Sequence, residues 1–531
     1  MNRSIGRAGT LAFTLACSAT ASAPHDHASG APPEPLGEVS FAVSCTPQAQ
    51  KSFNRAMALF HSFWFDPARR AFAQVLELDP KCAMAHWGIS FMSMGNPLAW
   101  PPGPQALQAG AEAWSRAQQL GAGSERENAY ITALGAFFKD WQSTEHRPRA
   151  LALEQAMGEV AARYPQDVEA QVLHALLLNA TAQPTDKACA NQLKAAGILE
   201  PLYRRHPNHP GIAHYLIHTF DYAGLAERGI PYARAYADIA PSVPHVQHMP
   251  SHIFSRVGDW PAMVESNRAS YQAARQELKA DTLDIGTYDA LHALDYLVFG
   301  HLQQAQHQAA KQWVDEVAAI RKVNVESFVA AYAFAAIPAR YALERGEWQE
   351  AAALQLSPAD LAWDQFPQAE AILVFARGLG AARSGNPDAA RKDVERLQTL
   401  QAAMRQNNLG YWADQAEFQI RAVNAWIAQA ESRPDEALRL MREAADLEEG
   451  TDKHPVTPGN VVPSRELLAE LLKVQNRPGE ALVEFERSLR RDPNRLRATQ
   501  GALEAATAAG DSDAVRRYER KVAGLTGGEA E

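Results

Sequence analysis

Short turn signals recur along the chain and divide it into Ala-rich runs with helical character. Gly followed by a polar residue, or a Pro-bearing equivalent, precedes most of these runs, and Leu-Asp-Pro or another proline closes the next run, as in residues 65–80, 235–241 and 485–493. We see no run of alternating β-branched residues that would build a sheet. This pattern of turn signals predicts an all-α chain of repeated helix hairpins. The predicted turns lie at Gly224, Gly258, Gly300, Gly346, Gly385, Arg433, Arg477 and Gly510.

The pattern resembles that of the tetratricopeptide repeat (TPR), which has a period of 34 residues and interlocks small and large apolar side chains between two antiparallel helices. Spacings of 40 or more between several middle turns depart from that period. The resemblance implies a right-handed α-solenoid of about eight or nine hairpins over residues 43–526. The residues that carry it are Ala68, Phe72, Pro80, Trp87, Gly88, Phe91, Ala481, Phe485 and Pro493.

A narrower resemblance covers nearly the whole chain after the N-terminal segment. Four stretches, DPKCAMAHWG (79–88), HMPSHIFSRVGDW (248–260), DALHALDYLVFG (289–300) and KHPVTPGNVVPSRELL (453–468), are similar to those of a family of exported bacterial TPR proteins. This resemblance implies a fold and a location. It implies no activity, so function is argued from the residues themselves.

The N-terminus has the features of a secretory signal peptide. Arg3 and Arg7 precede an apolar run, and Ala21-Ser22-Ala23 provides a small-residue cleavage site, so we expect residues 1–23 to be removed. A lipoprotein cleavage site at Cys17 is the alternative. Residues 24–42, rich in Pro and His, are predicted to be a flexible linker. No later apolar stretch reaches the roughly 20 residues of a membrane span, so we predict a periplasmic or secreted protein.

The net charge of the chain excludes one class of partner. Cleavage after residue 23 would remove two arginines and no acid, so the formal charge of −10 would become about −12. Nucleic acid is therefore not an expected partner.

Of the three remaining cysteines, Cys45 and Cys82 are predicted to pair after export and Cys189 to stay buried and free, although spacing alone does not fix connectivity.

Two HxxxH pairs are the main functional signal. His214 and His218 precede His248 and His252 by 34 residues, the repeat period. Residues four apart lie on one face of a helix, and the first helix of each hairpin lines the concave face of a solenoid. Because neighbouring helices pack about 8 to 10 Å apart, we expect the four imidazoles to form one patch in the groove.

Imidazole suits zinc, copper and iron, and two histidines four apart present two nitrogens to one ion. Neither pair carries the Glu of the HExxH zinc proteases. The sequence therefore predicts one transition metal ion, zinc, copper or iron. The alternative is that the histidines are groove-facing polar residues that bind a carboxylate or bond to neighbours. The predicted metal ligands are His214, His218, His248, His252 and His292.

Further residues are candidates for binding a ligand around that patch. Pro250 is expected to kink the helix between His248 and His252. The Pro- and Gly-rich stretch from residue 453 is predicted to cross the groove and close it, or else to be a rigid connector between repeats. The ligand-binding candidates are His174, His245, Asp221, Asp295, His454 and Glu466.

Three functions from different classes fit these residues. The first is an exported solenoid whose histidine-lined groove binds a metal ion or small anionic ligand. The second is a metal-dependent enzyme that uses the same cluster, with Asp295 or Glu466 as acid or base. The third is a scaffold for a protein or peptide partner in which the histidines have no role. No phosphate loop, GxSxG elbow or CxxC pair points to another chemistry.

Overall fold

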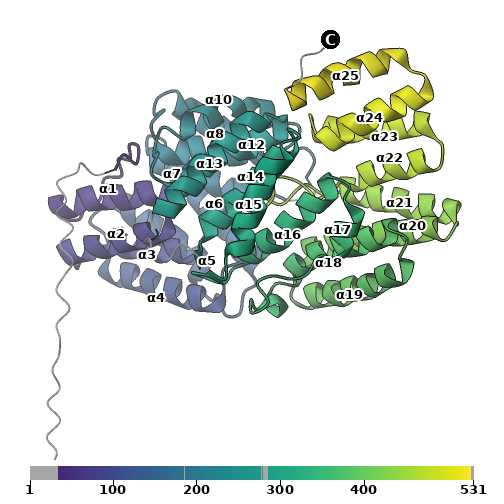
Figure 1. The fold of residues 1–531 in the computed structure, drawn as a ribbon. Coiled ribbons are helices and arrows are strands. Elements are labelled where there is room, and N and C mark those ends of the chain that lie inside the picture. The colour runs from purple at the N-terminus through teal and green to yellow at the C-terminus, as the bar shows by residue number, and fades with distance from the viewer. Residues whose placement is uncertain (1–33, 184–185, 277, 279–284, 528–531) are drawn as a thin grey trace, which may run out of the picture. The chain divides into compact units, whose positions relative to one another are not determined.

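The computed structural model describes residues 34–183, 186–276, 278 and 285–527 of the 531-residue chain (Figure 1). The predicted signal peptide and most of the predicted linker lie outside these residues. The unit from Pro35 onward is treated by itself below. In the part of the chain that is described, no helix is both long enough and apolar enough to span a membrane.

The unit is built almost entirely of helices, which confirms the predicted all-α class. The first set of helices is α1 (Pro47–His61), α2 (Phe65–Leu78), α3 (Ala83–Ser93), η1 (Pro97–Ala99), α4 (Pro104–Leu120), α5 (Glu125–Phe138), α6 (His146–Arg163), α7 (Val168–Thr181), α8 (Ala190–Tyr203), α9 (Pro210–Phe220), α10 (Ala226–Tyr236), α11 (Pro244–His248), α12 (Pro250–Val257) and α13 (Trp260–Gln276).

The remaining elements include one short pair of parallel strands, in which Ile285 pairs with Lys322 and Gly286 with Val323. They are β1 (Ile285–Gly286), α14 (Tyr288–Leu302), α15 (His307–Ala319), β2 (Lys322–Val323), α16 (Phe328–Glu344), α17 (Trp348–Ala352), η3 (Trp363–Gln365), α18 (Pro367–Arg383), α19 (Pro387–Gln406), α20 (Gly410–Ala430), α21 (Pro434–Glu449), α22 (Ser464–Val474), α23 (Pro478–Arg491), α24 (Leu496–Ala509) and α25 (Ser512–Thr526).

Consecutive helices pair as hairpins, and each hairpin packs on the next (Figure 1). α1 packs on α2, α3 on α4, and so on to α24 on α25, with α11 and α12 together forming one arm against α13. The described residues thus hold twelve hairpins, more than the eight or nine that the turn signals predict. Several early hairpins turn without a Gly-polar signal, such as the one that joins α5 to α6 through residues 139–145.

The hairpins interlock through the small and large residues that carry the TPR resemblance. Ala68, Phe72 and Trp87 are buried, and a Cβ at Gly88 would overlap the Phe72 ring. The same contact recurs near the C-terminus, where Gly501 faces the buried ring of Phe485. Glycine at these positions lets adjacent hairpins approach closely, and the TPR-like packing is confirmed at both ends of the array.

One predicted turn is wrong. Gly300 lies inside α14, and the chain turns after it at residues 303–306. A Cβ at Gly300 would lie 2.7 Å from Val264 Cγ2, so glycine is needed there for the close packing of α14 on α13. In a single sequence, a glycine at a helix contact cannot be told from a glycine at a turn.

The end of the predicted linker is packed. Leu36 and Phe41 are buried, and the Phe41 ring contacts Phe53, Trp87 and Tyr130. The Phe41 backbone N–H also donates to Asn54 Oδ1 at 3.2 Å. The prediction of a flexible segment is therefore wrong for residues 35–42, because the buried Phe41 ring anchors the segment on α1, α3 and α5.

Cys45 and Cys82 form a disulfide, as predicted, which ties the segment before α1 to the residue before α3. Cys189 is free but half-buried rather than buried. Closing a loop with a sequence separation of 37 restricts the unfolded chain, so replacing both Cys45 and Cys82 by Ser should lower the free energy of unfolding by about 4 kcal/mol.

The check is urea unfolding followed by circular dichroism. Cys189→Ser is the control, and its midpoint should stay near that of the unaltered protein. Equal midpoints for the double variant and the control would contradict a stabilising disulfide.

Candidate metal centre

The histidines of interest lie on the first helices of three consecutive hairpins. α9 carries His214 and His218, α11 and α12 carry the next three histidines of the patch, and α14 carries His292. α11 ends at His248 and α12 begins at Pro250, so the helix divides where Pro250 predicts a kink. This break leaves His245 and His248 on one segment and His252 on the other.

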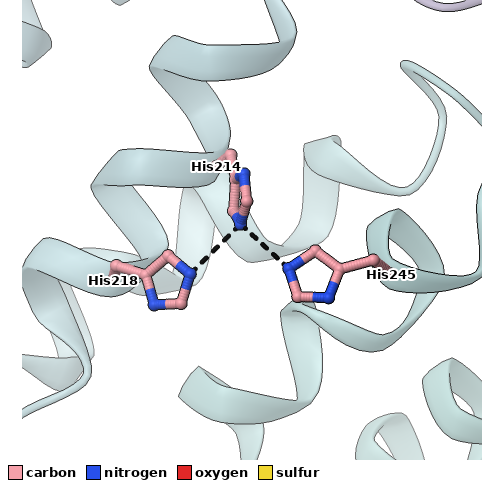
Figure 2. A group of neighbouring side chains, drawn as sticks. All are labelled: His214, His218 and His245. Carbon is pink, nitrogen blue, oxygen red and sulfur yellow. Dashed lines mark hydrogen bonds between the residues drawn. The ribbon is translucent and has the colours of Figure 1, made fainter. Parts of the chain in front are cut away.

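The first cluster is formed by His214, His218 and His245, which Figure 2 shows with their rings pointing toward one another. His214 Nε2 lies 3.1 Å from His218 Nε2 and 3.2 Å from His245 Nε2. We call it the first triad. The α9 pair is thus completed by His245 of the next hairpin, which had been predicted to bind a ligand rather than a metal.

The second cluster repeats this arrangement one hairpin later and consists of His248, His252 and His292. His248 Nε2 lies 3.1 Å from His252 Nε2, and the His292 ring centroid lies 4.2 Å from that of His248. We call it the second triad. The four histidines of the two HxxxH pairs thus divide between two groups, whereas the sequence predicted that they would share one ion.

Hydrogen bonds at Nδ1 fix the tautomers of three of these rings. His214 Nδ1 donates to the His61 carbonyl at 2.7 Å, and His252 Nδ1 donates to Asp221 Oδ2 at 2.8 Å. His248 Nδ1 donates to Asn267 Oδ1 at 2.7 Å, and the Asn267 amide is oriented because its Nδ2 donates to the Met263 carbonyl. A neutral imidazole carries one N–H, so Nε2 of each ring presents a lone pair.

The lone pairs of His248 Nε2 and His252 Nε2 therefore face each other across 3.1 Å. Two acceptors at that distance repel unless a proton or a cation lies between them. Nitrogens that bind one tetrahedral zinc at 2.0–2.1 Å are about 3.3 Å apart. The separations of His214 Nε2 from His218 Nε2 and His245 Nε2, and of His248 Nε2 from His252 Nε2, are 3.1 to 3.2 Å and close to that value. Metal-ligating histidines typically donate their other ring nitrogen to an acceptor, as His214, His248 and His252 do here.

Burial disfavours a proton on these rings. Desolvation lowers the pKa of His214, His218, His245, His248 and His292 well below 6.5, and neighbouring imidazoles lower it further. Desolvation also lowers the pKa of His252, although Asp221 opposes the shift. Neutral imidazole is the form that binds metal.

Asp221 anchors the second triad from behind. Besides His252, its carboxylate accepts from Arg256 Nε at 2.8 Å and lies 3.0 Å from Lys453 Nζ. All of these side chains are buried, and Arg256 also pairs with Asp452 at 2.9 Å. The cations Lys453 and Arg256 hold the pKa of Asp221 well below its usual value, although burial opposes them.

Lys453 belongs to the Pro- and Gly-rich stretch that was predicted to cross the groove. Arg340 on α16 holds this stretch, since its guanidinium donates to Thr457 Oγ1 at 2.6 Å and to the Gly459 carbonyl at 2.7 Å. Tyr296 on α14 donates to the Pro455 carbonyl at 3.3 Å. The stretch therefore lies across α14 and α16 and brings Lys453 to Asp221 at the end of α9.

A third group, His61, Glu169 and His209, is of a different kind. His61 Nε2 and His209 Nε2 donate to Glu169 at 2.8 and 2.9 Å, while His209 Nδ1 accepts from the N–H groups of Gly211 and Ile212 at the start of α9. His61 Nδ1 lies 2.9 Å from the hydroxyl of Tyr215. Every ring nitrogen of His61 and His209 has a partner in this network. The network fixes the position of His61, whose carbonyl accepts from His214 Nδ1.

Four predicted ligand residues lie outside both triads. His174 faces Gly158 on α6, Asp295 pairs with Arg340 at 2.8 Å, and His454 packs against Trp412. Glu466 pairs with the buried guanidinium of Arg495, and burial raises its pKa to about 7. Asp295 and Glu466 are therefore held in buried ion pairs with Arg340 and Arg495, and an acid or base role for either at the histidines stays a prediction.

The sequence also missed residues that contact the triads. Asn267 and His61 hold ring nitrogens, and the Phe63 ring lies 4.4 Å from His214 and stacks on His245 at 5.6 Å. The local sequence around Asn267 and His61 gives no signal, because these two residues reach the triads from α13 and from the end of α1. Phe63 is one of the aromatic residues near the histidines in the sequence, and it has a positive φ of 53°.

The solved structures that are similar to this chain share little of its sequence. No family model and no curated protein matches the chain. Among solved structures, Cut9 in the APC/C hetero-tetramer Cut9-Hcn1 is 14% identical over 86% of this chain and 76% of its own, with a TM-score of 0.34. A human IFIT1 dimer with PPP-AAAA is 11% identical over 88% and 89%, with a TM-score of 0.37, and the P58(IPK) TPR domain is 11% identical over 88% and 99%, with a TM-score of 0.21.

Proposed function

We propose that this protein binds transition metal ions through two three-histidine sites, one on α9 and α11 and the other on α11, α12 and α14. The observation that carries the proposal is the pair of facing lone pairs on His248 and His252, 3.1 Å apart, with each ring fixed by an acceptor at Nδ1. A bound cation relieves this repulsion, and protonation would place a charge in a buried site.

Zinc, copper and iron all suit an imidazole ligand set. Each triad supplies three neutral nitrogens, which leaves at least one coordination position for water or another small ligand. Such an open position is the arrangement of a catalytic site, so hydrolytic or oxidative activity is the next property to assay. We further propose that the protein acts after export, where the Cys45–Cys82 disulfide is stable.

Binding of a protein or peptide through the hairpin surfaces is the second function that stacked helix hairpins support. On the first helices near the triads, this binding surface is restricted, because residues 453–463 lie across α14 and α16 and α1 contacts α9. A partner of this kind would therefore be expected on other faces of the described unit.

Elemental analysis of the exported protein, purified without a His tag or chelators, tests the metal proposal. The unaltered protein should retain zinc, copper or iron, and the His248→Ala/His252→Ala variant should lose about one ion per chain, because a triad reduced to one ligand no longer holds it. His174→Ala is the matched control, since His174 lies on α7 outside the triads. Metal-free protein that takes up no ion on reconstitution would refute the proposal.

A further inference from the structure

The two triads adjoin each other. The ring centroids of His218 and His252 are 5.8 Å apart, and those of His245 and His248 are 6.3 Å apart. His245 and His248 also lie on the same short helix, α11, so one rigid element contributes to both triads. Ions held by the two triads would therefore be close neighbours.

The ligand set supplies no negative charge. All six ligands are neutral imidazoles, so two divalent ions would bring four positive charges into a buried region. The carboxylates packed behind the rings are already paired, since Asp221 binds Arg256 and Lys453, and Asp295 binds Arg340. A buried charge is costly unless an opposite charge compensates it.

We infer that the two triads form a single two-ion centre that takes a small bridging anion between the ions. This inference rests on the metal binding proposed above. Hydroxide from water is the simplest such anion, and one anion that touches both ions offsets charge where the protein side chains do not. Two metal ions that share a ligand in this way are a recurring arrangement in proteins that activate water or small molecules.

The centre is least buried at His245. His245 is half-buried, while the other ligands are buried. The Phe63 ring packs against His214 and His245. An aromatic ring packed on the least buried ligand favours an anion of a few atoms over a large substrate.

Copper(II) as the metal and azide as the anion make the inference testable on the full exported chain. Metal-free protein is loaded with copper(II), its copper content is measured, and its electron paramagnetic resonance intensity is recorded during an azide titration. We expect two copper ions per chain, a saturating azide stoichiometry of one per two coppers, and a spin intensity well below the copper content, because a shared ligand couples the two spins.

The His292→Ala variant separates a two-ion centre from two independent sites. With the second triad reduced, we expect about one copper per chain and a spin intensity equal to the copper content, because a single ion has no partner to couple with. His174→Ala should behave as the unaltered protein does.

Each other outcome is decisive. Two coppers with full spin intensity and one azide each would show separate sites and overturn the two-ion centre, while the proposed metal binding would stand. One copper per unaltered chain would have the same meaning. No retained copper would refute both the two-ion centre and the proposed function.

Discussion

The free energy of unfolding of the metal-free protein should fall steeply as the pH drops below about 6.5. Five triad histidines have pKa values well below 6.5 in the folded state, because burial disfavours their charged form. In the unfolded chain they take up protons near pH 6.5. The unfolded state then binds more protons, so stability is complete above that pH and is lost as the pH falls.

The expected size of this effect is large. Each histidine that is protonated only in the unfolded chain contributes about 1.4 kcal/mol per pH unit, so five contribute up to about 7 kcal/mol per pH unit below their unfolded pKa. A domain is typically stable by only about 5 to 15 kcal/mol. Urea unfolding at a series of pH values between about 7.5 and 5.5 measures the slope directly.

Two comparisons sharpen this measurement. His248→Asn removes one titrating ring and should reduce the slope by about 1.4 kcal/mol per pH unit. Zinc or copper added at saturating concentration should stabilise the folded state at neutral pH. This stabilisation should disappear in acid, because protons compete with the metal for the same nitrogens. A flat pH dependence in the metal-free protein would show that the rings are not buried and neutral.

Asp221→Asn should be the most destabilising single change near the centre. The substitution leaves Arg256 and Lys453 buried beside a neutral amide, and loss of one partner from a buried ion pair costs about 3 to 5 kcal/mol. It also replaces the acceptor that fixes the His252 ring, so metal affinity should fall by about 10- to 100-fold.

Asp66→Asn is the control for this change. Asp66 forms a similar ion pair with Arg69, but both side chains are exposed, and such pairs contribute about 0 to 1 kcal/mol. Urea unfolding and metal titration of both variants give the two effects separately. An Asp221→Asn protein as stable as the Asp66→Asn protein would contradict the role given to the buried network.

The sequence predicted the type of fold correctly but not the number of its hairpins. Helix ends at Pro and Gly, and the interlock of Phe72 with Gly88, are local features that a sequence displays. The count was low because hairpins such as α5 with α6 turn without the Gly-polar or Pro signals on which the count was based. Gly300 shows the opposite case, in which a residue typical of turns meets a packing requirement.

At the site, the 34-residue repeat predicted which histidines lie in one region but not how they divide into two triads. The 34-residue offset brings the two HxxxH pairs to equivalent places on α9 and α11–α12. Their division into triads depends on His245 and His292, whose placement follows from the break at Pro250 and from the packing of α14 on α11. Asn267, His61 and Lys453 act through contacts between distant segments, which one sequence does not reveal.

Two tertiary ties described above change how this array should come apart. In a simple stack each repeat touches only its neighbours, so unfolding can begin at an end and proceed unit by unit. Here the His61 carbonyl accepts a hydrogen bond from His214, which lies 153 residues later in the sequence. Lys453 likewise donates to Asp221, which lies 232 residues earlier. Both contacts are made to the hairpin that begins with α9. Unfolding of the segment that carries His61 or of the segment that carries Lys453 therefore destabilises this hairpin, and the unit that unfolds cooperatively extends well beyond a single repeat.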